Sequence, residues 1–219
     1  NEDRRVARDD FGTNPCSEII LRPREFCNLT EAVVRSDDTI SSLTKKVELA
    51  TILGTWQSTL TNFRYLGSKW KTNCEEERLL GVSLTGIMDS TLTNGLNDKN
   101  LPHLLTKLKE KAVKTNKEQA LELGINPSAS ITCVKPSGTV SQLVDSASGI
   151  HTRHSPYYIR TVRSDVKDPL CQLLIDSGVP HEPDVTNPSN VMIFSFPMKS
   201  PELSLTRKDL SAIDQLKLH

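Results

Sequence analysis

The stretch from which this sequence is best understood is Asn14-Pro15-Cys16-Ser17-Glu18-Ile19. Pro15 fixes its own φ and disfavours the helical region for Asn14, so the segment is predicted to be an extended loop. In an extended segment, alternate side chains point to the same side. Asn14, Cys16 and Glu18 are therefore expected to present an amide, a thiol and a carboxylate together. This combination is typical of a reactive site, whereas a lone free cysteine is usually a small buried hydrophobe.

A second cysteine motif, Cys27-Asn28-Leu29, begins eleven residues after Cys16. The remaining cysteines lie in no motif and are expected to be structural: Cys74, Cys133 and Cys171. His151 and His154 fit no standard zinc spacing with Cys133, so no metal site is expected.

The second chemical motif is Lys135-Pro136-Ser137-Gly138-Thr139, between a predicted strand over 130–134 and a helix predicted to begin near Val140. Backbone N–H groups at a helix start, with hydroxyls nearby, form an anion site, and Gly138 allows close approach of a phosphate. The motif is not a Walker A loop, because its spacing differs from G-x-x-x-x-G-K. Its alternative interpretation is a turn with a helix N-cap. The candidate phosphate-binding residues are Pro136, Ser137, Gly138 and Thr139.

Hydrophobic periodicity predicts two long helices. Apolar residues recur every three or four positions over 43–63, with Ser42 as a possible N-cap and Gly67 beyond the end. A second helix is predicted over 101–123 and closed by Gly124. Its lysines alternate with glutamates, which is typical of a solvated helix face.

Shorter elements complete the pattern. Strands are predicted from β-branched and aromatic residues over 130–134, 157–162 and 191–196. Helices are predicted over 168–177 and from Thr206, which forms a capping-box-like pair with Asp209. The stretch over 81–89, Gly-Val-Ser-Leu-Thr-Gly-Ile-Met-Asp, is interpreted as a short helix with two packing glycines. Strands separated by helices predict an α/β fold with parallel pairing.

Composition excludes several functional classes. Lys+Arg and Asp+Glu each number 27, so no basic field is available to attract nucleic acid. No run of about 18 apolar residues exists to cross a membrane, and the charged segment over 1–10 is no signal peptide. Five cysteines without regular spacing argue against a secreted disulfide framework and favour a reducing cytoplasm.

Together, the stretches over 14–29, 81–89 and 134–163 resemble the catalytic chains of ribonucleotide reductases. Asn-Pro-Cys, the spacing between its cysteine and Cys27, and Gly149-Ile150-His151 resemble the adenosylcobalamin-dependent class. The resemblance implies part of that family's ten-stranded α/β barrel as the fold. It also implies adenosylcobalamin as the cofactor and reduction of ribonucleotides to deoxyribonucleotides as the activity.

The resemblance further implies a role for each site residue. Cys16 matches the cysteine that becomes a thiyl radical and removes the 3′ hydrogen atom of the ribose. Glu18 matches the carboxylate that takes the 3′-hydroxyl proton, and Asn14 matches the amide that orients the hydroxyls. Cys27 matches one of two cysteines that supply two electrons as the 2′-hydroxyl leaves as water. The loop over 136–139 matches the substrate-phosphate loop.

The chain is expected to be a segment of such a reductase. It lacks an initiator Met, and only thirteen residues precede Asn14. The resemblance implies that 1–219 is one partial barrel domain, without the N-terminal half-barrel, the cysteine partner of Cys27 and the C-terminal tail. The implied partners are a ribonucleoside di- or triphosphate, a thioredoxin-like reductant and a complementary reductase chain.

Three alternatives stay open at this point. The chain could be a non-catalytic or split-gene piece, which gain of activity on adding a complementary chain would test. It could belong to the iron-dependent class, although Tyr157-Tyr158 follows the phosphate loop too closely to be that class's radical-relay pair. It could be a plain phosphate-binding α/β module, whose nucleotide binding would be insensitive to changes at Cys16 and Glu18.

Overall fold

The computed structural model describes Arg5, residues 9–95 and residues 100–219, which divide into two compact units. The larger unit comprises Asn1–Arg153 and Leu203–His219, and the smaller unit is His154–Glu202. Among the helices in the described ranges, none has the length and apolar content that crossing a bilayer requires.

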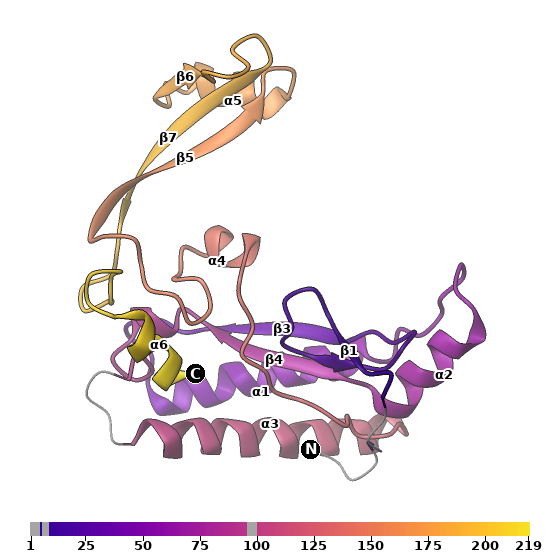
Figure 1. Ribbon diagram of the computed structural model, residues 1–219. Coiled ribbons are helices and arrows are strands. Elements are labelled where there is room, and N and C mark those ends of the chain that lie inside the picture. Colours follow the sequence, from indigo (N-terminus) through magenta and orange to yellow (C-terminus); the bar gives the residue numbers. More distant parts are fainter. Residues whose placement is uncertain (1–4, 6–8, 96–99) are drawn as a thin grey trace. The chain divides into compact units, whose positions relative to one another are not determined.

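The larger unit is built on two parallel strands, β3 (Asn28–Val33) and β4 (Leu80–Thr85). They pair in register from Asn28 opposite Leu80 to Val33 opposite Thr85. Two helices, α1 (Ile40–Gln57) and α3 (Leu101–Leu123), cover one face of this sheet (Figure 1). Buried apolar side chains from the strands and helices form the main core: Ala32, Val34, Leu43, Val47, Ala50, Leu80, Val82, Leu104, Leu108, Ala112 and Ile131.

The predicted strand over 130–134 is reduced to one parallel bridge, between Thr132 and Val82. The amides of Leu80 and Val82, two residues apart, bond to the carbonyls of the consecutive residues Ser130 and Ile131. This mismatch interrupts the ladder in the manner of a bulge, so the segment follows the sheet without forming a regular strand.

The first predicted helix is shorter than its apolar spacing suggested. α1 is capped by Thr39, which exchanges hydrogen bonds with Ser42, and it ends at Gln57. The hydroxyl of Ser58 bonds back to a carbonyl of the last turn, a local competition that is common where helices stop. Gly67 does not close this helix but begins the next one, α2 (Ser68–Glu77). The prediction over 101–123 is confirmed by α3, whose C-cap Gly124 has a φ of 64°.

The helix predicted over 81–89 is wrong. Those residues form most of β4 and a turn of 3-10 helix, η1 (Ile87–Asp89). Gly86 separates the two with a φ of 78°, and a Cβ there would lie 2.5 Å from the carbonyl oxygen of Val34. The glycine is therefore needed for a close backbone approach at the strand end.

Four short elements complete the larger unit. β1 (Gly12–Thr13) and β2 (Ile20–Leu21) form an antiparallel pair. α4 (Thr139–Leu143) begins where a helix was predicted, whereas α6 (Ala212–Leu218) is capped by Ser211. The pair of Thr206 and Asp209 instead closes an earlier turn.

The smaller unit is an antiparallel sheet with the strand order β5-β7-β6 and one helix. Its elements are β5 (Tyr157–Asp165), α5 (Pro169–Asp176), β6 (His181–Pro183) and β7 (Val191–Lys199). The strands predicted over 157–162 and 191–196 and the helix over 168–177 are confirmed. The predicted parallel pairing fails here, because β5 and β7 run antiparallel along nine residues each. It holds for β3 and β4.

Gly86→Ala is expected to destabilise the larger unit by about 2 kcal/mol or more, because a side chain there combines a positive φ with a backbone clash. Gly54→Ala is the matched control. Its Cβ would meet Leu80 at 3.5 Å, an ordinary contact, and alanine favours the helix by roughly 0.5–1 kcal/mol. Urea unfolding followed by the fluorescence of Trp56 and Trp70, both in the larger unit, measures both changes. Equal stability of the two variants would contradict this role of Gly86.

Candidate active site

The face of the β3–β4 sheet away from α1 and α3 carries the candidate chemistry. Because strand side chains alternate, Leu29 and Glu31 of β3 point to this face. The β1–β2 hairpin and α4 lie on the same side (Figure 1). A Cβ on Gly81 of β4 would lie 2.4 Å from Leu29 Cδ2 and 3.2 Å from Cys133 Sγ. Glycine at this position therefore makes room for the side chains that gather on the face.

Residues 14–19 form the closed end of the hairpin and are not extended. The backbone N–H of Asn14 donates to the carbonyl of Ile19 at 3.2 Å, and Asn14 Oδ1 accepts from the N–H of Ile19 at 3.0 Å. Ser17 has a φ of 62°, and its N–H donates to the carbonyl of Asn14 at 2.9 Å. The predicted alternation of side chains is therefore wrong, because the pairing of β1 with β2 forces the chain to reverse between them.

The thiol and the carboxylate differ in their exposure to solvent. Cys16 is exposed at the end of the hairpin. Both carboxylate oxygens of Glu18 are buried and have no hydrogen-bond partner among the described residues. Ile19 anchors the hairpin in a second apolar cluster with Leu79 and Ala129. The hairpin thus turns Glu18 inward and leaves Cys16 accessible.

Cys27 and Cys133 both pack against this second cluster, together with Leu29. Burial raises the pKa of Cys27, and the Glu18 carboxylate raises it further. Burial and Glu18 also raise the pKa of Cys133, to about 12. Both thiols therefore keep their protons at neutral pH. Within the described ranges, no three His, Cys, Asp or Glu side chains gather as a metal site.

Cys133 was expected to be a structural cysteine outside any motif, and this interpretation is incomplete. It shares the cluster and the electrostatic influence of Glu18 with Cys27. The signal in the sequence is its position two residues before Lys135, which places both side chains on one side of an extended segment. Glu31 was also missed, although it follows Cys27 at the alternate spacing of a strand.

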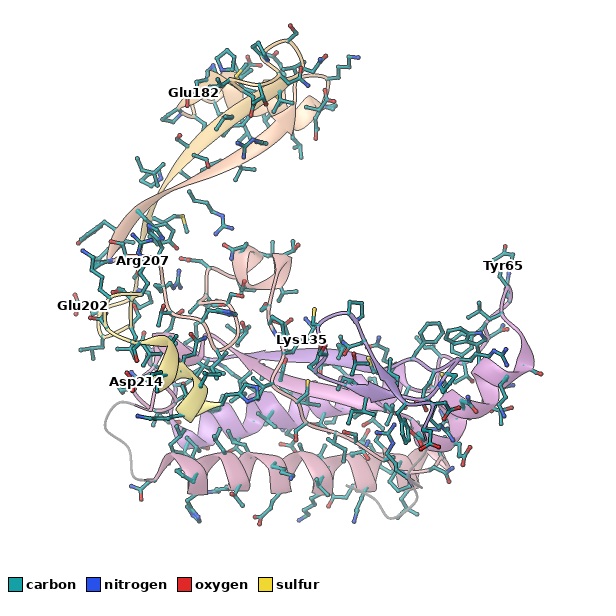
Figure 2. The ribbon with its side chains drawn as sticks, in the orientation of Figure 1. Tyr65, Lys135, Glu182, Glu202, Arg207 and Asp214 are labelled. Carbon is teal, nitrogen blue, oxygen red and sulfur yellow. The ribbon has the colours of Figure 1, made fainter. Side chains whose placement is uncertain are left out.

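The phosphate-loop motif divides into exposed and buried residues. Pro136, Gly138 and Thr139 are exposed, and a Cβ on Gly138 would meet no atom within 4 Å. Ser137 is buried, and its hydroxyl donates to Glu31 Oε2 at 2.6 Å. Lys135, labelled in Figure 2, pairs with the other oxygen of Glu31 at 3.2 Å. Gly138 is therefore open to a ligand, whereas the Ser137 hydroxyl is already engaged.

A buried ion pair supports this loop from behind. Arg153 donates from Nε and Nη2 to the two oxygens of Asp89, at 2.9 and 2.8 Å. Thr85 Oγ1, at the end of β4, accepts from the N–H of Gly149 at 2.8 Å. Gly149 has a φ of 53°, and a Cβ there would lie 2.7 Å from the carbonyl oxygen of Lys135. The residues over 81–89 and Gly149 thus set the position of the candidate phosphate loop.

Comparison with known proteins gives consistent matches. No protein-family model matches the chain. The chain is 31% identical over 215 residues to the adenosylcobalamin-dependent ribonucleoside-triphosphate reductase of Lactobacillus acidophilus, covering 88% of this chain and 28% of that protein. It is 30% identical over 214 residues to the protein of the same name from Euglena gracilis, covering 95% of this chain and 28% of that protein.

A solved structure agrees with the sequence matches. The crystal structure of a B12-dependent (class II) ribonucleotide reductase aligns with a TM-score of 0.77 and 25% identity, over 95% of this chain and 33% of that one. The predicted fold, an α/β segment of the reductase barrel, is confirmed by this match. The chain spans about 28% of the length of the two relatives.

Thiol reactivity should separate the cysteines on this face. Iodoacetamide at neutral pH should label the exposed Cys16 first and Cys133 last, because Cys133 is shielded and holds its proton. Glu18→Gln should speed labelling of Cys27 and Cys133, since removing the negative charge lowers both pKa values. Glu182→Gln, an exposed change in the smaller unit, is the control. Peptide mass spectrometry gives the order. Labelling of Cys133 as fast as Cys16 in the folded chain would contradict the geometry.

Proposed function

This chain is a relative of the adenosylcobalamin-dependent (class II) ribonucleotide reductases, and we propose that it carries the radical and phosphate-binding parts of a ribonucleotide-reducing site. One observation supports this most strongly: the Cys16 hairpin and the loop that leads into α4 lie on the same face of the sheet that contains β3, the strand that follows Cys27. The substrate we propose is a ribonucleoside triphosphate, as the relatives' names state for those proteins. The chain, over 1–219, would act as a partial catalytic barrel.

Cys16 is proposed to hold the thiyl radical that removes the 3′ hydrogen atom of the ribose. An S–H bond is comparable in strength to the C–H bond that it replaces, so the transfer can be reversible. The exposed end of the hairpin leaves Cys16 Sγ open to a bulky group, which fits adenosylcobalamin. When bound, that cofactor supplies the one-electron chemistry that takes the hydrogen from the Cys16 thiol.

Glu18 is proposed to accept the proton of the 3′-hydroxyl. Its buried oxygens have no partner among the described residues, so they are available to a hydroxyl group that enters the face. A buried carboxylate without a hydrogen-bond partner gains one when the substrate hydroxyl binds. Asn14 Oδ1 is used to close the hairpin, which leaves its Nδ2 group for the role of orienting the ribose hydroxyls.

Cys27 is proposed as one of two reducing cysteines. Oxidation of two thiols to a disulfide releases two electrons and two protons, and these remove the 2′-hydroxyl as water. The raised pKa of Cys27 keeps its S–H bond intact until that step. A thioredoxin-like reductant would restore the thiols. The other cysteine and the rest of the barrel would come from a complementary part of the reductase.

The phosphates are proposed to bind at 136–139. Gly138 precedes α4 and is open on the side where a Cβ would stand, so a phosphate can approach the backbone there. Thr139 is exposed beside it, and Pro136 shapes the turn. Ser137 contributes by fixing the loop to β3 and not by offering a free hydroxyl.

Cys16→Ser should abolish nucleotide reduction and leave nucleotide affinity nearly unchanged, because a hydroxyl keeps the shape but cannot form an accessible radical. Cys27→Ser should stop deoxynucleotide formation yet preserve exchange of the 3′ hydrogen, which needs only Cys16. The assay supplies a ribonucleoside triphosphate, adenosylcobalamin, a dithiol and a complementary reductase segment. A Cys16→Ser variant that keeps a substantial rate would rule out the radical assignment, and multiple turnovers by Cys27→Ser would rule out its redox role.

Gly138→Val should raise the KM for the nucleotide by about tenfold or more, equivalent to about 1.4 kcal/mol. The added side chain meets no atom of the chain but occupies the phosphate approach. Gly149→Ala is the informative contrast, because its Cβ clashes with Lys135 from behind and should weaken both binding and stability. KM values and urea unfolding curves separate the two effects. Unchanged binding in a stable Gly138→Val variant would remove this loop from the site.

A further inference from the structure

Glu31 is a partly buried acid on β3 to which the proposed reaction assigns no role. It lies four residues after Cys27, and four residues of a strand span about 13 Å. By strand alternation the two side chains belong to the same face of the sheet. The side chain of Glu31 is only 10% exposed, so its charge is largely removed from water. Such a group requires partners that compensate its desolvation.

Both partners of Glu31 come from the motif over 135–139, which contains the candidate phosphate loop. Oε1 lies 3.2 Å from Lys135 Nζ, and Oε2 accepts from Ser137 Oγ at 2.6 Å. Ser137 Oγ in turn accepts the N–H of Ser141, in the first turn of α4, at 3.2 Å. The carboxylate therefore holds the loop on both sides of Pro136. Charge-assisted bonds of this kind are stronger and more directional than neutral ones.

Two other contacts hold the loop from a different direction. Ser148 Oγ donates to the carbonyl of Ser137, and Gly149 packs behind Lys135. Both residues belong to the segment fixed to the end of β4 by Thr85 and Arg153. The bonds from Glu31 instead connect the loop to β3. Glu31 thus supplies a side-chain connection between the loop and β3, the strand that follows Cys27.

We propose that Glu31 is a positioning residue for nucleotide reduction. It fixes the loop over 136–139 relative to the strand that follows Cys27, so that a nucleotide held by its phosphates places its ribose over the thiols. This inference rests on the proposed function. It predicts a loss of phosphate binding when the tie is broken, even though Glu31 itself does not contact the nucleotide.

The test compares the full chain with Glu31→Gln, Ser137→Ala, the double variant and Glu182→Gln as an exposed control for the charge. Hydrogen exchange over 136–141 reports the tie directly. Equilibrium dialysis with a ribonucleoside triphosphate reports binding, and urea unfolding reports global stability. Glu31→Gln should speed exchange over 136–141 and weaken triphosphate binding by about tenfold. The double variant should lose no more affinity than Glu31→Gln alone, because both changes break the same tie.

Several outcomes would overturn the proposal. Unchanged exchange over 136–141 in Glu31→Gln would show that Glu31 does not hold the loop. Faster exchange with unchanged triphosphate affinity would show that it holds the loop without positioning the phosphates. Fully additive losses in the double variant, with a shifted unfolding curve, would indicate a general structural role. Failure of the wild-type chain to bind the triphosphate would overturn the proposed function as well. A loss of binding that is seen only in the variants leaves the proposed function intact, so the two failures can be distinguished.

Discussion

The parallel register of β3 on β4 is the constraint on which the larger unit depends. With Leu29 opposite Gly81 and Ala32 opposite Leu84, alternate residues go to opposite faces of the sheet. One set builds the apolar core beneath α1 and α3. The other set leaves Glu31 and the space above Gly81 to the site. A shift by one residue would exchange the two faces, so the core and the chemistry are specified together.

On the site face, glycines allow neighbouring atoms to approach closely, and two carboxylates lie near the thiols and Lys135. Glycine at positions 81, 86 and 149 lets side chains and backbone come nearer than any other residue would allow. Burial, and after it the Glu18 carboxylate, raises the pKa of the thiols of Cys27 and Cys133, so both keep their protons at neutral pH. The negative charge of Glu31 is paired with the positive charge of Lys135. The unused oxygens of Glu18 contrast with the fully engaged carboxylate of Glu31, as expected if one acts on substrate and the other on the loop.

The sequence was most informative where periodicity is long or a motif is dense. The helix over 101–123 was predicted to the residue, because its apolar stripe is regular and Gly124 closes it. The motifs over 14–19 and 135–139 were both assigned to one site, which stays a prediction, and the structure places them on the same side of the sheet. The helix and the two motifs were found from local signals, either spacing or turn chemistry, that do not require knowledge of the tertiary fold.

The errors arose where tertiary contacts decide. β1 and β2 have two residues each, too few to show a period, so the hairpin that reverses residues 14–19 was invisible. The stretch over 81–89 was interpreted as a helix, since a short apolar run with glycines fits either element. The association of Cys133 with Cys27 depends on packing between segments a hundred residues apart. The role of Glu31 could not be predicted for the same reason, because its contacts with Lys135 and Ser137 also join distant segments.

The central claim is that a single nucleotide spans the loop over 136–139 and the thiols on the same sheet face. A crystal structure of the chain with its complementary reductase segment and a bound ribonucleoside triphosphate tests this most directly. The phosphates should contact the backbone around Gly138, and the ribose should lie between Glu18 and Cys27, within reach of Cys16. A nucleotide bound elsewhere, such as in the cavity of about 320 Å³ lined by Leu105 and Ile150, would contradict the account.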